Sequence, residues 1–357
     1  MARLLRTGAF AALLASTGCS GGDVADLPTL CSTTDIEQSL TTQLSATTTD
    51  TDFSLLLSRS DGREYVFERG DSHANSQYES ASTSKWVSAV VILRLVQQGY
   101  LSLDDHPQDY ITDWPITDSG NSLYGITLRE LLSFTSGLEV EPTCLDIKLA
   151  NFSNCVNTIA SSNMDKGVAH GSRFYYASTH LQVAGQMAII AAGKNNWGEV
   201  FAEFQSETGL FAHGTYDLPS ASNPRLAGGM HWQGDEYLAF IQAFAAGDLL
   251  NSSLMAEILK DQLSGKTIQF SPVTSSLNEE WHYGFGLWHE CESVTFNCTA
   301  GQRVSSPGAY GAYPFWDRQY AYSGILARQG ALGTYPKGID LVRSVQADIE
   351  RWAKCSH

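Results

Sequence analysis

The sequence predicts an α/β protein of the α+β kind, in which helices flank an antiparallel sheet lobe built from both chain ends. β-rich runs occur near the amino end and again after residue 270, and helical patterns occupy the chain between these two regions. We therefore expect a sheet lobe over about 51–85 and 270–357, with a mainly helical lobe inserted over about 100–265.

The first elements have clear local signals. Two β-rich runs, 52–59 and 63–68, flank Ser60-Asp61-Gly62 and predict a hairpin. The next segment, 83–98, carries apolar residues on nearly all sides, which indicates a buried central helix ending at Gly99.

The remaining elements follow from periodicity and composition. Helical patterns occupy 128–134, 181–192, 197–207, 235–246 and 254–263, β-rich runs occupy 281–289, 319–328 and 339–345, and a last helix covers 345–354.

The amino terminus is expected to be an export signal. Arg3 and Arg6 precede a short apolar stretch, and small residues lead to Cys19. We interpret 1–18 as a signal peptide with Cys19 lipidated and 19–50 as a tether followed by a first helix; a plain secretory signal cut nearby is the alternative. The predicted location is the periplasm or cell envelope, and Ser20 mildly favours the outer membrane.

Charge limits the partners. The 357 residues carry a formal net charge of −16, and no run of basic residues accompanies interleaved aromatic residues. Nucleic acids and anionic membrane surfaces are therefore not expected as partners, apart from the membrane holding the lipid anchor.

The cysteines predict disulfides. With Cys19 set aside, six of the seven cysteines remain, and export favours their oxidation. Short loops suggest the pairs Cys144–Cys155 and Cys291–Cys298, which leaves Cys31–Cys355, although six cysteines allow about 15 pairings. Zinc is the rival interpretation, but neither CxxC nor HxxxH spacing occurs, and we expect no metal.

Ser82 and Lys85 form an S-x-x-K motif at the entry to the predicted central helix. Residues three apart share a helix face, so the Lys85 amine can reach the Ser82 hydroxyl. Burial would lower the lysine pKa and allow it to act as a base. The alternative is an N-cap serine beside a solvated lysine. The apolar residues Trp86 and Val87 directly after Lys85 disfavour a solvated position.

Three blocks resemble the serine β-lactamase and penicillin-binding-protein superfamily. They are 82–101, the thirteen-residue block 126–138, and Arg225-Leu226-Ala227-Gly228-Gly229. The resemblance extends from about Asp52 to Trp352 and is nearest to class C-type hydrolases such as carboxylesterases and 6-aminohexanoate-dimer hydrolases. It implies a β-lactamase/transpeptidase-like fold over 51–357 and a serine hydrolase without a cofactor.

The resemblance also implies a second motif, Tyr-x-Asn, at Tyr176-Ala177-Ser178. Tyr176 would share protons with Ser82 and Lys85 as general acid or base, and which of Tyr176 and Lys85 accepts the first proton stays open. Ser178 replaces the family's asparagine as a substrate-binding residue.

The third motif is expected at Tyr322-Ser323-Gly324, as a substrate-binding edge strand. The resemblance implies that the N–H groups of Ser82 and Ile325 form the oxyanion hole. A glycine within a strand can instead mark a bulge. Because Tyr322 is uncharged, a carboxylate-bearing substrate is less favoured.

The sequence therefore predicts an exported enzyme that cleaves a small-molecule ester or amide through a Ser82 acyl-enzyme. One alternative is a β-lactamase or D-alanyl-D-alanine peptidase acting on β-lactams or peptidoglycan. The other is a catalytically inactive penicillin-binding-like envelope lipoprotein. The predicted site needs no histidine, so His73, His170, His180 and His213 are expected to be ordinary polar residues.

Overall fold

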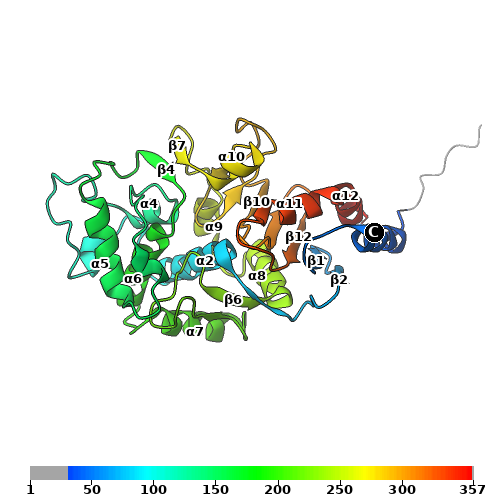
Figure 1. Cartoon of the computed structure of the whole chain (residues 1–357), viewed down its shortest axis with the longest axis horizontal. Helices are drawn as coiled ribbons and strands as arrows, with labels where there is room; N and C mark the ends of the chain where they lie inside the picture. Colours follow the sequence, from blue (N-terminus) through cyan, green and yellow to red (C-terminus); the bar gives the residue numbers. More distant parts are fainter. Residues whose placement is uncertain (1–30, 356–357) are drawn as a thin grey trace, which may run out of the picture. The chain divides into compact units, whose positions relative to one another are not determined.

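A seven-stranded antiparallel sheet brings the two ends of the chain together (Figure 1). Its order is β2-β1-β12-β11-β10-β9-β8. The strands are β1 Ser54–Arg59, β2 Glu64–Glu68, β8 His282–Tyr283, β9 Trp288–His289, β10 Arg303–Ser305, β11 Tyr313–Asp317 and β12 Tyr322–Ala327. The predicted sheet from both termini is therefore confirmed.

The computed structural model describes residues 31–355. The expected signal peptide 1–18 and the expected lipidation at Cys19 lie outside the described residues. From Thr33 onward the chain forms one unit. Among the described residues, no helix is both long and apolar enough to cross a membrane.

The first and last strands of the chain, β1 and β12, pair with each other inside the sheet. Leu56 lies opposite Ile325 in this ladder, and all six residues of β1 are buried. On its other side β1 pairs with β2 through the predicted hairpin, where Gly62 has a φ of 85°. Such a left-handed conformation suits glycine, which has no Cβ to clash.

Helices from both ends cover the sheet. Helix α1, Thr33–Ala46, packs against α12, Gln346–Lys354, and α8, Gly234–Ala246, packs against β12 and β1. Helix α8 therefore lies on the sheet. This differs from the expectation, which placed residues 234–246 in the helical lobe.

One predicted strand is wrong. Residues 339–344 belong to helix α11, Tyr335–Ser344, and Val345 directly follows its end. A proline stands in its first turn, where the missing N–H costs nothing, and Ile339 and Val342 lie three apart on its buried side. This spacing overrides the β-propensity of the individual residues.

The middle of the chain is mainly helical, as predicted. Its helices are α3 Pro107–Tyr110, α4 Leu128–Leu132, α5 Phe152–Asn163, α6 Thr179–Ala191, α7 Trp197–Thr208, α9 Ser252–Ile258 and α10 Pro272–Leu277. Helices α3, α5 and α10 were not predicted from the sequence. Two small sheets, also not predicted, join β3 Gln77–Glu79, β6 Met230–Gln233 and β5 Thr215–Tyr216, and β4 Arg173–Tyr175 with β7 Thr267–Phe270.

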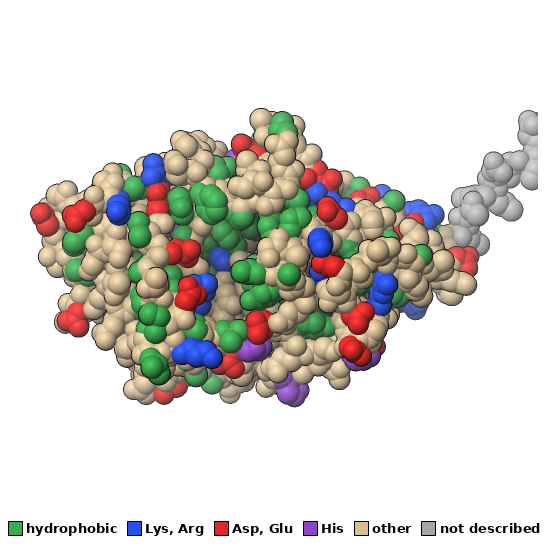
Figure 2. All heavy atoms as spheres, viewed as in Figure 1, with side chains coloured by type: hydrophobic (Ala, Val, Ile, Leu, Met, Phe, Trp, Pro, Cys, Tyr) green, Lys and Arg blue, Asp and Glu red, His purple; other side chains and the backbone are tan. Residues whose placement is uncertain are grey.

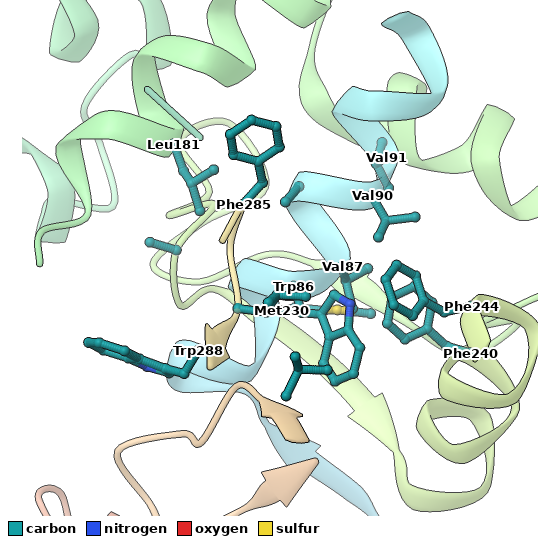
Figure 3. Close-up of a cluster of buried hydrophobic side chains, with 14 of the residues drawn as sticks. Trp86, Val87, Val90, Val91, Leu181, Met230, Phe240, Phe244, Phe285 and Trp288 are labelled. Atoms are coloured by element: carbon teal, nitrogen blue, oxygen red, sulfur yellow. The ribbon is translucent and has the colours of Figure 1, made fainter. Parts of the chain in front are cut away.

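Helix α2, Ser84–Gln97, is the predicted buried central helix. Figure 1 shows it between the helices of the middle of the chain and the large sheet. Trp86 is fully buried, with its ring edge-on to those of Phe240 and Phe244 at 5.9 and 5.2 Å (Figure 3). The first turn of α2 is thus held rigidly by packing on all sides.

Two of the predicted disulfides are confirmed. Cys144–Cys155 and Cys291–Cys298 are bonded, with Cα–Cα distances of 5.5 and 5.6 Å. Cys31 and Cys355 are each disulfide-bonded, and the bond between these two stays a prediction.

Because Trp86 fills the contact between α2 and α8, we expect Trp86→Ala to lower the free energy of unfolding by about 3–5 kcal/mol. Trp86→Phe should cost less, because it keeps most of the apolar contact and removes a buried indole N–H that has no acceptor among the described residues. Urea unfolding of the two variants checks this order, and equal stabilities would contradict it.

Candidate active site

Ser82 stands in a tight turn that leads into α2. The turn is a 3₁₀ segment, Ala81–Thr83, and Ala81 has a φ of 43°, a conformation that costs energy for a residue with a Cβ. Lys85 is the second residue of α2, and its Nζ donates to Ser82 Oγ at 2.8 Å. The i, i+3 contact expected from the sequence is therefore present.

The Lys85 amine is buried, and its second partner is a backbone carbonyl. Nζ donates to Ala227 O at 2.7 Å. Burial lowers the pKa of Lys85 to about 7, whereas the negative charge of Glu141 opposes this shift. A large fraction of this lysine is therefore uncharged near neutral pH.

The two glycines after Ala227 lie against neighbouring backbone segments. A Cβ added at Gly229 would lie 2.1 Å from Leu218 O, and one added at Gly228 would lie 3.7 Å from Ala81. The block 225–229 thus packs directly against the turn that carries Ser82.

Tyr176 follows β4, and the expected second motif lies beside Ser82. Its N–H donates to Phe270 O at 3.1 Å, which fixes the backbone against β7. Its ring stacks on Trp288 at 5.1 Å, and Lys85 Nζ lies 4.7 Å from the centre of its ring. The structure therefore brings Ser82, Lys85 and Tyr176 together.

Tyr176 keeps its proton at neutral pH. Burial raises the pKa of its phenol well above the ordinary value, although hydrogen bonding with Ser82 and Trp288 works in the opposite direction. The phenol can therefore pass a proton on, but it is a poor first acceptor compared with Lys85.

The third motif was placed wrongly. Tyr322, Ser323, Gly324 and Ile325 belong to β12, which β11 separates from β10, and Ile325 is fully buried between β1 and β11. The Tyr322 hydroxyl accepts from Arg303 at 2.9 Å and from Gln346 at 2.8 Å. With its backbone in a central ladder, this strand cannot offer an N–H to a group at Ser82.

Gly324 is a packing glycine. A Cβ added there would lie 2.4 Å from Phe315 and 2.7 Å from Leu57. As the sequence suggested, this position requires glycine. The reason is tight packing against side chains in the core of the sheet, not the approach of a ligand.

The segment beside Ser82 is Ser306-Pro307-Gly308, directly after β10. Ser306 Oγ donates to Ser82 O at 2.9 Å. A Cβ added at Gly308 would lie 2.6 Å from Ser80 O. This segment was not predicted from the sequence. The signal that could have identified it is the short run of serine, proline and glycine before the aromatic residues of β11.

A cavity of about 220 Å³ opens beside Ser82 and Tyr176. Its other lining residues are mostly apolar, and none of them is charged: Pro272, Val273, Trp288, Pro307, Ala309, Leu332, Gly333 and Tyr335. Figure 2 shows a hollow near the middle of this face, with hydrophobic side chains above and beside it and charged side chains on its left rim.

Ser178 lies at the start of α6, where its N–H donates to Glu141 Oε1 at 2.6 Å. His180 is buried behind it and bonds Ser136 Oγ at 2.7 Å and Tyr175 O at 2.9 Å. Burial lowers the pKa of His180 to about 4, so it is neutral and braces the loop of Tyr176.

Within residues 31–355, no group of three or more His, Cys, Asp or Glu side chains could hold a metal ion.

Comparison with known proteins identifies the family of this chain. A family model described as Beta-lactamase matches residues 56–330. Protein flp of Staphylococcus aureus is 26% identical over 133 residues, which is 37% of this chain and 26% of that protein. The matched part is thus only about a quarter of that relative's length.

Solved structures share the fold. A putative β-lactamase from Bacteroides dorei has a TM-score of 0.68 at 24% identity, over 82% of this chain and 93% of its own. EstCE1, described as a hydrolase with promiscuous acyltransferase activity, has a TM-score of 0.68 at 18% identity, over 90% and 98%. A mutant of simvastatin synthase from Aspergillus terreus has a TM-score of 0.66 at 14% identity, over 94% and 100%.

The corrected third motif can be tested with two hydroxyl deletions. Ser306→Ala removes the bond to the carbonyl of Ser82, so we expect labelling of Ser82 by a fluorophosphonate to slow by about tenfold, which is about 1.4 kcal/mol. Tyr322→Phe should label at the wild-type rate, because its hydroxyl faces Arg303 and Gln346. Slower labelling in Tyr322→Phe than in Ser306→Ala would restore the original assignment.

Proposed function

Since this protein belongs to the β-lactamase family, a family of serine hydrolases, we propose that it cleaves an ester or an amide through an acyl-enzyme on Ser82. One observation carries the proposal: a buried amine with a pKa of about 7 lies 2.8 Å from the serine hydroxyl. A base with a pKa near the working pH is well suited to activate a hydroxyl.

In the first step, uncharged Lys85 accepts the Ser82 proton while one of its N–H bonds still donates to Ala227 O. The Ser82 oxygen forms a bond to the substrate carbonyl carbon, and the π electrons move to the carbonyl oxygen. The oxyanion electrons then re-form the carbonyl π bond while the bond from the carbonyl carbon to the leaving oxygen or nitrogen breaks. Tyr176 gives its proton to that departing atom and receives one from the Lys85 ammonium. Water releases the acid by the same steps in reverse order.

The oxyanion formed in the first step needs hydrogen-bond donors that stabilise its negative charge. By the family's pattern, they are the N–H of Ser82 and that of the residue after the third motif, which is Ala309 once the motif is placed at Ser306-Pro307-Gly308. The Ala309 N–H supports this proposal, since it donates to no acceptor within the described part of the chain. Ala309 also lines the cavity next to Ser82.

The cavity supports the ester or amide proposal over a β-lactam or a peptidoglycan terminus. Both of the latter carry a carboxylate, and none of the cavity's lining residues is a Lys or Arg that would bind it. The apolar walls fit a hydrocarbon or aromatic group on one side of the scissile bond.

We also propose that the protein works in the cell envelope, anchored through lipidated Cys19. The signal-like residues 1–18 motivate the proposal. The disulfides Cys144–Cys155 and Cys291–Cys298 support it, because such bonds persist in oxidising compartments.

Substitution of the nucleophile is the first test. We expect the wild-type protein to gain the mass of one fluorophosphonate adduct, and Ser82→Ala to gain none and to hydrolyse p-nitrophenyl esters more than about a thousandfold more slowly. Intact-mass analysis reads the labelling, and circular dichroism verifies that the variant is folded. A labelled, active Ser82→Ala would sink the proposal.

The role of Lys85 predicts a pH dependence. Since the neutral amine is the active form, kcat/KM should rise with pH through about 7 and level off above it. Lys85→Arg keeps the positive charge at every pH, so it should lose more than about a hundredfold in kcat/KM on the plateau. A wild-type profile that is flat between about pH 5.5 and 8.5 would argue against Lys85 as the base.

A further inference from the structure

An acidic side chain lies next to Ser178, two residues after Tyr176, and forms no ion pair within the described residues. Glu141 is exposed, and one of its carboxylate oxygens accepts the Ser178 N–H at 2.6 Å. Within the described residues, no Lys, Arg or His nitrogen comes within 4.0 Å of this carboxylate. Its second oxygen is therefore available to a ligand.

Glu141 is bonded to the segment that carries a catalytic group, because Ser178, whose N–H it accepts, is two residues after Tyr176. Consistent with this position, its charge raises the pKa of Lys85, against the effect of burial, and also raises the pKa of Tyr176. A group of the substrate bound at Glu141 would therefore lie near the bond that Ser82 attacks.

The charged residues near Glu141 in the sequence form ion pairs. Glu139 pairs with Arg173 at 2.6 Å, and Asp146 pairs with Arg225. Arg225 is the cation that lowers the pKa of Lys85, but Asp146 already offsets its charge. Of the acidic residues Glu139, Glu141 and Asp146, Glu141 is the one that forms no ion pair within the described residues.

The loop that carries Glu141 is held in place. Cys144, three residues later, is bonded to Cys155 of α5, and its carbonyl accepts from Asn223 at 2.8 Å. The Ser178 N–H fixes the carboxylate itself. Where the family's pattern places an asparagine amide, this chain presents the small Ser178 with the Glu141 carboxylate bonded to its backbone.

We propose that Glu141 makes the enzyme selective for substrates with a cationic group, such as an alkylammonium, on the side of the scissile carbonyl that faces Ser178. This inference rests on the proposed function and adds the charge of the substrate to it. Such a substrate would place its cation on Glu141 and its apolar part in the cavity beside Tyr176.

Two matched pairs of esters test the proposal. In each pair a trimethylammonium group replaces a tert-butyl group of the same shape, on the acyl side in one pair and on the alcohol side in the other. Measuring kcat/KM at low salt and well above the acidic limb of the pH profile prevents the effect of Glu141 on Lys85 from contributing.

We expect the wild type to prefer the cationic member of one pair. Glu141→Gln keeps an oxygen for the Ser178 N–H and removes the charge, and it should lower the ratio of cationic to neutral kcat/KM by about tenfold. Glu139→Gln is the matched control, two residues away on the same loop, and should keep the wild-type ratio.

Equal ratios in the wild type and Glu141→Gln for both pairs would overturn the inference while leaving the proposed function intact. A similar drop in Glu139→Gln would also overturn it, since it would show a general effect of loop charge. Failure of every ester to turn over, together with no fluorophosphonate adduct on Ser82, would overturn the proposed function itself and the inference with it.

Discussion

The burial of the Lys85 amine in the first turn of α2 is the constraint on which the site depends. A charged amine at this depth would be costly, so the same burial that packs the helix also makes the amine available as a base. Only one backbone carbonyl, that of Ala227, and the Ser82 hydroxyl accept hydrogen bonds from it within the described residues. Packing and reactivity therefore have the same physical origin.

The surrounding elements hold this amine in position from several directions. Trp86 packs α2 against α8, and the loop 225–229 supplies the Ala227 carbonyl that accepts from the amine. The segment directly after β10 contributes Ser306, whose hydroxyl donates to the carbonyl of Ser82. Residues from the beginning, middle and end of the chain meet here because the first and last strands pair in one sheet.

The two sides of the active site differ in chemistry. The cavity beside Tyr176 is apolar and uncharged, whereas the rim near Ser178 presents the carboxylate of Glu141. Position along the chain does not suggest this division, since Glu141 and Ser178 are 37 residues apart. The division matters because specificity depends on which groups face the substrate around a common set of reacting atoms.

The sequence by itself determined the elements whose signals are local. The Gly62 hairpin, the apolar α2, the Ser82 and Lys85 pair and the two short disulfide loops all depend on residues close together in the chain. Resemblance to a family added Tyr176. The tertiary structure alone decided which strand borders Ser82, because strand order in a sheet is not encoded in the local pattern of any one strand. Tyr322 and Gly324 are residue types that occur in active sites, but β11 lies between their strand and β10. The Tyr322 hydroxyl and the close packing at Gly324 therefore stabilise the core instead. It also decided that Glu141 reaches Ser178, since that contact depends on how a loop folds back over the start of α6.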